Sequence, residues 1–120
     1  MVKDFVRAME ELVSKYDELF NAFLSKLIEE FPDVTIVLFG SRARGDARRS
    51  SDFDLLIITE RRLTWSDRAR IYGMAGELPI DVFVISPMDL SKPLIRQMLR
   101  DGCRVIHDPR NLNPCGLASP

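Results

Sequence analysis

Apolar and polar positions fall into blocks along the chain, and the first block predicts a long helix. From about residue 3 to residue 31, apolar side chains recur at helical spacing and charged side chains occupy the other face. Pro32 ends this helix, because the residue before a proline disfavours the helical region. The apolar stripe is wide, so we expect part of it to contact a partner protein as well as the core.

Shorter apolar runs predict strands. Their β-branched and continuously apolar composition is typical of strands buried on both faces of a sheet. These runs cover residues 34–39, 53–59, 80–85 and, more briefly, 103–106. Residues 65–77 and 87–100 have the pattern of helices, the first capped by Thr64 and the second opening at Ser86 with a proline in its first turn. The order of elements predicts an α/β (α+β) domain, with a small mixed sheet of about four strands flanked by helices.

Length and composition indicate one ordinary globular domain. The chain has 120 residues, of which 46% are hydrophobic and 29% charged. We expect a single domain over residues 1–107 and a flexible tail over residues 108–120, where proline, asparagine, glycine and serine are frequent. Cys103 and Cys115 are the two cysteines, too few for a disulfide framework, and we expect no functional bridge between them.

Charge and hydropathy exclude several classes of function. The net charge of −1 makes nucleic acid an unlikely direct ligand, because proteins held to it by bulk electrostatics are clearly basic. No apolar run approaches the roughly 20 residues that cross a bilayer, and the first residues lack the layout of a signal peptide. We therefore expect a cytoplasmic protein without membrane contacts.

Two carboxylates at the start of the second strand are the most informative feature. Asp52 and Asp54 are two residues apart, so in a strand both point to the same face. Carboxylates held about 4 Å apart repel by roughly 4 kcal/mol at an effective dielectric constant near 20. A cation would offset this repulsion, and hard oxygen ligands suit Mg²⁺. A pair of turn or capping residues at a strand start is the structural alternative.

The predicted topology gathers further polar groups around this pair. If the first two strands are antiparallel neighbours, Gly40 and Ser41 lie at the same end of the sheet as the aspartates. Gly40 would let backbone amides approach a phosphate closely, and Ser41 would add a hydroxyl donor. A crossover helix makes the second and third strands parallel and brings Asp81 to that end. Three acids and a phosphate cradle would then converge, as two-metal phosphoryl transfer requires.

This pattern resembles the signature of the DNA polymerase β nucleotidyltransferase superfamily. The pattern is Gly40-Ser41, ten intervening residues, Asp52-Phe53-Asp54, and a later lone acid in a strand. Within the superfamily, the stretch from Gly40 to Leu55 is similar to the minimal nucleotidyltransferases, single-domain proteins of the antitoxin type. The likeness covers about residues 34–85, and the rest of the chain by element order only. Many relatives have proline and an acid where this chain has Arg49 and Ser50, a loop change that leaves the acids intact.

The resemblance implies a role for each matching residue. Gly40 and Ser41 would hold the nucleotide phosphates, and Ser51 would belong to the same nucleotide site. Asp52 and Asp54 would bind two Mg²⁺ ions. Asp81 would complete the second metal site and help to deprotonate the acceptor. Arg44 is a candidate phosphate ligand, because a guanidinium group can donate two hydrogen bonds to a phosphate. The sequence does not assign substrate contacts to the other arginines of this stretch, Arg42, Arg48 and Arg49.

The resemblance also implies a partner. Minimal nucleotidyltransferases are commonly paired with a helical ribonuclease of the HEPN type (the higher eukaryote and prokaryote nucleotide-binding family), encoded nearby. Transfer of AMP from ATP to a tyrosine of that partner blocks the ribonuclease, and a homo- or hetero-oligomer is compatible with this pairing. Two alternatives stay open at this point, a non-catalytic antitoxin that masks its partner and the catalytic half of a small-molecule, antibiotic-type nucleotidyltransferase. The sequence does not choose ATP over other nucleoside triphosphates.

Overall fold

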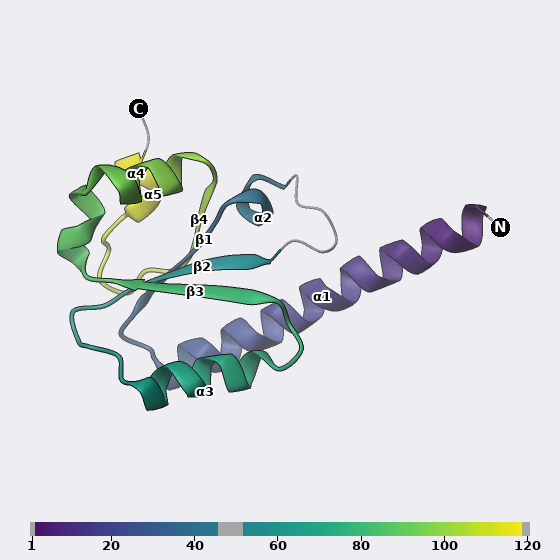
Figure 1. Ribbon diagram of the computed structural model, residues 1–120, viewed down its shortest axis with the longest axis horizontal. Helices are drawn as coiled ribbons and strands as arrows, with labels where there is room; N and C mark the ends of the chain where they lie inside the picture. Colours follow the sequence, from purple (N-terminus) through teal and green to yellow (C-terminus); the bar gives the residue numbers. More distant parts are fainter. Residues whose placement is uncertain (1, 46–51, 119–120) are drawn as a thin grey trace.

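The elements follow one another as a helix, a strand and then alternating helices and strands (Figure 1). The computed structural model describes residues 2–45 and 52–118, with side chains described for residues 16–45 and 52–116. The elements are α1 (Val2–Glu30), β1 (Thr35–Phe39), α2 (Ser41–Arg44), β2 (Phe53–Ile58), α3 (Trp65–Ala75), β3 (Ile80–Ile85), the 3₁₀ helix η1 (Pro87–Ser91), α4 (Pro93–Arg100), β4 (Cys103–His107) and α5 (Pro114–Ala118). This is the mixed α/β architecture predicted from the pattern of apolar runs.

The strands of the described residues form one mixed sheet in the order β3-β2-β1-β4. β1 and β2 are antiparallel, with Phe39 opposite Asp54. β2 and β3 are parallel, with Asp54 opposite Asp81. Both pairings agree with the predicted topology, in which α3 serves as the crossover. β4 pairs with β1 on its other side, also antiparallel, with Cys103 opposite Phe39.

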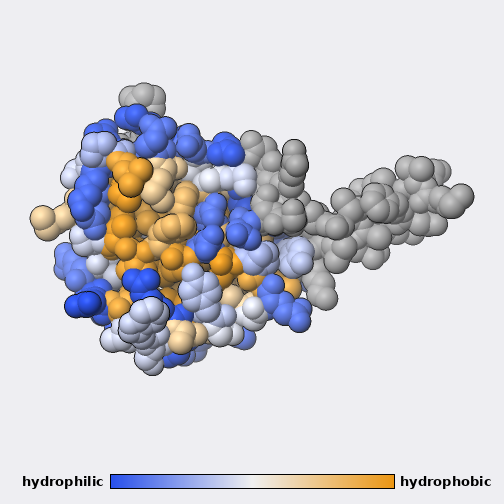
Figure 2. All heavy atoms as spheres, viewed as in Figure 1, coloured by the Kyte–Doolittle hydropathy of each residue, from blue (hydrophilic) through white to orange (hydrophobic). Residues whose placement is uncertain are grey.

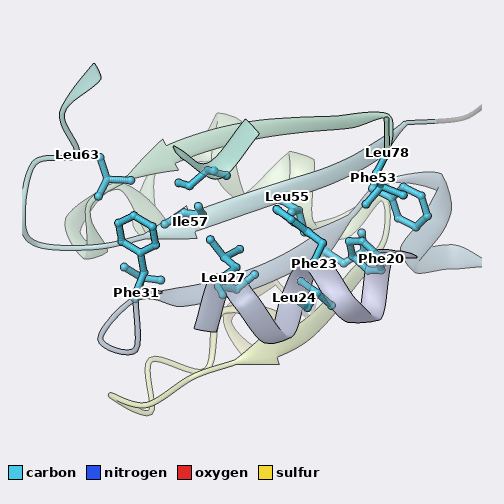
Figure 3. Close-up of a cluster of buried hydrophobic side chains, with 14 residues drawn as sticks. Phe20, Phe23, Leu24, Leu27, Phe31, Phe53, Leu55, Ile57, Leu63 and Leu78 are labelled. Carbon is cyan, nitrogen blue, oxygen red and sulfur yellow. The ribbon is translucent and has the colours of Figure 1, made fainter. Parts of the chain in front are cut away.

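Each face of the sheet is covered by its own hydrophobic cluster. On one face, α1 and α3 pack against every second residue of the central strands, including Leu38, Leu55 and Ile57 (Figure 3). On the other face, η1 and α4 contribute Leu90 and Leu99, which pack with alternate residues of β1 and β2. Because β1 and β2 are buried on both faces, their sequences are continuously apolar rather than alternating. The first half of α1 extends past the sheet (Figure 1).

The helix predicted over residues 87–100 is divided in two. η1 ends at Ser91 and α4 begins at Pro93, with Lys92 extended between them at φ −68° and ψ 135°. The cause is Pro93, which lacks an N–H for the helical ladder and disfavours helical geometry in the preceding residue. The four-residue helix α2, directly after β1, was not predicted.

The end of the chain differs from the predicted flexible tail. Asp108 accepts hydrogen bonds from the backbone N–H groups of Leu112 and Asn113, both at 2.9 Å, and α5 follows. A disulfide joins Cys103 of β4 to Cys115 of α5, contrary to the expectation of no bridge. Residues 108–116 therefore pack back onto the domain. None of the described helices is long and apolar enough to cross a membrane.

Candidate active site

The turn that follows β1 is held by two glycines in contact. Gly40 has φ 76°, and a Cβ atom at this position would lie 2.8 Å from Oδ2 of Asp54. Its N–H donates to the carbonyl oxygen of Gly102 at 3.2 Å. Gly102 has φ 146°, and a Cβ atom there would lie 2.5 Å from the Gly40 carbonyl oxygen. Any side chain at either position would therefore disturb the turn or the carboxylate beside it.

Ser41 is the first residue of α2 and lies directly beside this turn. The carbonyl oxygen of Gly40 accepts from the N–H groups of Ala43 and Arg44, both at 3.1 Å. Gly45 closes the short helix in the left-handed conformation. The first N–H groups of a helix have no acceptor within the helix, so such an end suits an anion. The turn thus combines backbone donors with a half-buried serine hydroxyl.

Three carboxylates lie on the sheet face next to this turn. Asp54 is in β2, in register with Asp81 of the neighbouring parallel strand β3. Asp52 precedes Asp54 by two residues, on the same side of the chain. Phe53, between the two, is buried in the cluster on the opposite face, against α1. The three acids therefore share the face that α4 covers further along the sheet, with Asp54 half-buried and the other two exposed.

The electrostatics of Asp54 differ from those of an ordinary surface acid. Burial raises the pKa of the Asp54 carboxyl, and the charges of Asp81 and then Asp52 raise it further. Ionised Asp54 therefore lowers the stability of the folded protein, and a bound cation would reduce this loss. Within residues 16–45 and 52–116, no three acidic, histidine or cysteine side chains stand close enough to form a ready-made metal site. The acids are neighbours in a strand pair whose charges repel, and hard oxygen donors of this kind suit Mg²⁺.

A family comparison identifies the domain that carries this site. The model of the nucleotidyltransferase domain family matches residues 21–106. This chain belongs to the nucleotidyltransferase domain family. The matched range includes the glycine–serine turn, the three carboxylates and Gly102.

Relatives of this nucleotidyltransferase include two named as protein adenylyltransferases. One, from Methanocaldococcus jannaschii, is 34% identical over 116 residues, covering 79% of this chain and 74% of the relative. Another, MntA of Haemophilus influenzae, is 39% identical over 62 residues, covering 51% of this chain and 53% of the relative. A toxin–antitoxin complex solved with AMP-PNP contains a chain of the same fold, with a TM-score of 0.55, 20% identity and coverage of 80% of this chain and 81% of that one.

The arginines of the nucleotidyltransferase lie on different sides of the turn. Arg44 donates from its guanidinium to the carbonyl oxygen of Asp101, in the segment between α4 and β4. The guanidinium of Arg42 lies 4.0 Å from the centre of the Phe53 ring, toward the α1 face. Arg42 is thereby placed away from the face that carries the acids, whereas Arg44 helps to join the turn to the segment that contains Gly102.

Some residues of the predicted site are not described by the structure, and one residue beside the turn was not predicted. Ser51, Arg48 and Arg49 lie outside the described residues, so their predicted or open roles are unchanged. Gly102 was missed: in the sequence it is only a glycine after a helix, a common stop signal. The signal that could have found it is its position directly before a strand predicted to lie in the same sheet as the Gly40 turn.

Proposed function

We propose that this nucleotidyltransferase transfers AMP from ATP to a tyrosine hydroxyl of a HEPN-type ribonuclease encoded nearby, and so acts as an antitoxin. The names of the two adenylyltransferase relatives support a protein as the acceptor. The toxin–antitoxin complex of the same fold was solved with AMP-PNP, an ATP analogue, which supports both ATP and a toxin partner. An antitoxin of a ribonuclease works where RNA is translated, so we propose the cytoplasm as its location.

The observation that carries the proposal is the placement of three carboxylates beside a glycine–serine turn. Asp54 is flanked by Asp81 across the strand pair and by Asp52 along the chain, and all three charges are coupled through the pKa of Asp54. A surface used only to mask a partner has no need of three acids that repel one another. The alternative of a non-catalytic antitoxin is therefore less well supported than catalysis.

The donor chemistry of the acids suits Mg²⁺, and in the proposal Asp52 and Asp54 would be ligands of two ions, with Asp81 moving close enough to complete the second site. When bound, Mg²⁺ neutralises phosphate charge and stabilises the attacking and leaving oxygens. The Gly40–Ser41 turn would hold the phosphates through its N–H groups and hydroxyl. Arg44 and Ser51 remain proposed nucleotide contacts, and for Arg44 the bond to Asp101 means that it would have to share or change its partner.

The proposed transfer is a single displacement at phosphorus. The tyrosine oxygen forms a bond to the α-phosphorus of ATP while the bond from that phosphorus to the bridging oxygen breaks, and pyrophosphate leaves. The phenolic proton passes to the carboxylate of Asp81 and then to water. Asp81 is exposed, so a residue of a separate protein can reach it. Asp54 is half-buried, so the hydroxyl of a separate protein reaches it less readily than it reaches Asp81.

The direct test is an intact-mass measurement of the partner after incubation with the purified chain, ATP and Mg²⁺. The partner should gain the mass of one or more AMP groups, and its ribonuclease activity should fall in parallel. Asp54→Asn should abolish the gain. Asp67→Asn is the matched control, because Asp67 belongs to the capping box of α3 at the other end of the sheet, and it should retain the kcat of transfer.

A partner whose modified tyrosine is replaced by phenylalanine should gain no AMP. Inhibition of the ribonuclease by the Asp54→Asn variant, at full strength and without any AMP transfer, would favour the masking alternative. AMP transfer to a small molecule and not to the partner would favour the antibiotic-type alternative.

A further inference from the structure

An open pocket lies at the end of the sheet opposite the carboxylates. Its volume is about 740 Å³, and it is lined by the loop after β2, the start of α3 and the residues at the end of β3. These are the carboxyl ends of two parallel strands, where crevices of α/β sheets commonly bind ligands. Thr59 lies five residues after Asp54 along the chain, which is about 17 Å at 3.3 Å per residue. The pocket is therefore distinct from the proposed catalytic site.

The uncompensated charge of this pocket is positive. Three of its charged side chains are already paired with residues outside or at its rim. These pairs are Arg61 with Asp33 at 3.4 Å, Glu60 with Arg110 at 2.9 Å and Asp89 with Lys92 at 2.7 Å. Arg62 and Arg68 also line the pocket, and neither has an ion-pair partner within the described part of the chain. Two guanidinium groups are thus left for an anionic ligand.

An exposed aromatic side chain stands beside these arginines. Trp65, the sole tryptophan of the chain, lines the pocket at the start of α3 and is 89% exposed. Arg68 and Tyr72 follow it on the same helix face, three and seven residues later. The Tyr72 hydroxyl accepts from the N–H of Val82 at 3.1 Å, so this face continues to the outer edge of β3. Apolar residues gather over β3 on the surface shown in Figure 2.

We propose that this pocket, together with the exposed face of α3, docks an acidic segment of the protein acceptor. Carboxylates of that segment would pair with Arg62 and Arg68, and an apolar side chain would pack on Trp65. Exposed tryptophan and arginine are the residue types most enriched at the energetic centres of protein interfaces. The inference rests on the proposed function in that the acceptor is a protein. A protein acceptor is large enough to contact the pocket and the acids at the same time, across about 17 Å.

Mixed charge in the pocket favours a peptide over a polyphosphate or a nucleic acid. Glu60 and Asp89 also line it, so the pocket offers two separate guanidinium groups without an ion-pair partner among the described residues, and not the continuous basic surface that a dense polyanion requires. The hydroxyl of Ser86, which could have donated to a phosphate, donates instead to Asp89 at 3.1 Å. A peptide with separated carboxylates can pair with two arginines and leave the acidic side of the pocket uncontacted. These two arginines therefore favour an acidic protein segment as the ligand of this pocket.

The test uses the full chain in EDTA without nucleotide, so that binding is measured apart from catalysis. A displayed library of random peptides is selected against it, and selected peptides are titrated while the emission of Trp65 is recorded. We expect enrichment of acidic sequences that carry an aromatic or aliphatic residue, and a shift of the emission to shorter wavelength. Replacing both arginines (Arg62→Glu with Arg68→Glu) should weaken binding about tenfold or more. Trp65→Ala should do the same, measured by titration calorimetry because that variant has no tryptophan.

The control is Arg100→Glu, the same kind of substitution at an exposed position of α4, which should bind as the parent does. With the partner protein and ATP, Trp65→Ala should raise the KM for the partner and leave kcat unchanged. Selection of basic or unrelated peptides, or equal binding by the double arginine variant, would overturn the inference. So would a tryptophan signal that responds to inorganic triphosphate or single-stranded RNA and not to peptides. Failure of AMP transfer in its own assay would not change these binding results.

Discussion

Replacing Asp54 with asparagine removes one charge from the three acids and, in EDTA, should raise the free energy of unfolding. Burial, Asp81 and Asp52, in that order, raise the Asp54 pKa in the folded state. A carboxyl with a raised folded pKa destabilises the fold once pH rises above its unfolded pKa, and the full cost is present above the folded pKa. At pH 7 the parent carries this cost and the variant does not.

The magnitude follows from the strand geometry. Asp54 and Asp81 are opposite one another on adjacent strands, which lie about 4.8 Å apart. At about 5 Å, two unit charges repel by roughly 0.8 kcal/mol in a water-like dielectric and by roughly 3 kcal/mol at a dielectric constant of 20. Asp81 is exposed, so screening places the gain near the lower value. We expect Asp54→Asn to stabilise the metal-free protein by about 0.5–1 kcal/mol.

The assay is urea denaturation in EDTA, with Asp67→Asn as the matched substitution. Asp67 accepts from the N–H of Thr64 at 2.9 Å and completes the capping box of α3. The backbone hydrogen bond from Thr64 lowers the pKa of Asp67, so its charge contributes stability above the unfolded pKa that is lost as pH falls through the folded pKa. The same chemical change should thus stabilise at one position and destabilise at the other.

Two results would refute this reasoning. One is a loss of stability in EDTA on Asp54→Asn, which would make Asp54 a structural acceptor. The other is unchanged AMP transfer by that variant. In Mg²⁺ and ATP the order of stabilities should reverse, because ligand at a hundredfold excess over its dissociation constant adds about 2.7 kcal/mol to a protein that binds it. The parent would gain this stability and the variant would not.

Three further changes test the turn and its surroundings. Ser41→Ala should reduce kcat/KM by roughly tenfold to a hundredfold, since one donor to a charged acceptor contributes about 1.5–3 kcal/mol, with an unchanged melting temperature; unfolding would make Ser41 structural. Gly102→Ala should lower both the melting temperature and the activity. The control Gly73→Ala, where a Cβ would have nothing within 4 Å, should stabilise α3 by about 0.5–1 kcal/mol. Equal changes of the melting temperature in calorimetry would contradict the contact of Gly102 with Gly40. Cys115→Ser should lower the free energy of unfolding by about 2–3 kcal/mol, and dithiothreitol should lower that of the parent by the same amount. An unchanged free energy of unfolding in both experiments would show that the disulfide does not form.

The parts of the fold that the sequence predicted depend on local patterns. β1 and β2 were identified because strands buried on both faces are continuously apolar, and the shared face of Asp52 and Asp54 follows from the two-residue period of a strand. The break at Pro93 is also local and could have been predicted from the restriction on the residue before a proline. The residue-by-residue roles at the site remain predictions until the variants are measured.

The parts that were missed depend on contacts between distant segments. The Gly40–Gly102 contact joins residues far apart in the chain. Gly40 was predicted from its place before Ser41, but no motif around Gly102 in the sequence indicates that it contacts this turn. The Cys103–Cys115 bridge spans 12 residues, but it forms because α5 packs back onto β4, which the polar composition of the tail did not indicate. Sequence periodicity describes which face a residue occupies within one element, and it does not specify which loops meet.

Both missed contacts act on the same turn. Gly102 directly precedes Cys103, whose backbone lies opposite Phe39, and Phe39 directly precedes Gly40. The disulfide therefore anchors the strand that holds the proposed phosphate turn in place. Cytosolic thiols are usually kept reduced, so in the proposed location the bridge would be open much of the time. The pairing of β4 with β1 and the Gly40–Gly102 hydrogen bond do not require the bridge, and we expect the reduced protein to lose global stability before it loses the geometry of the turn.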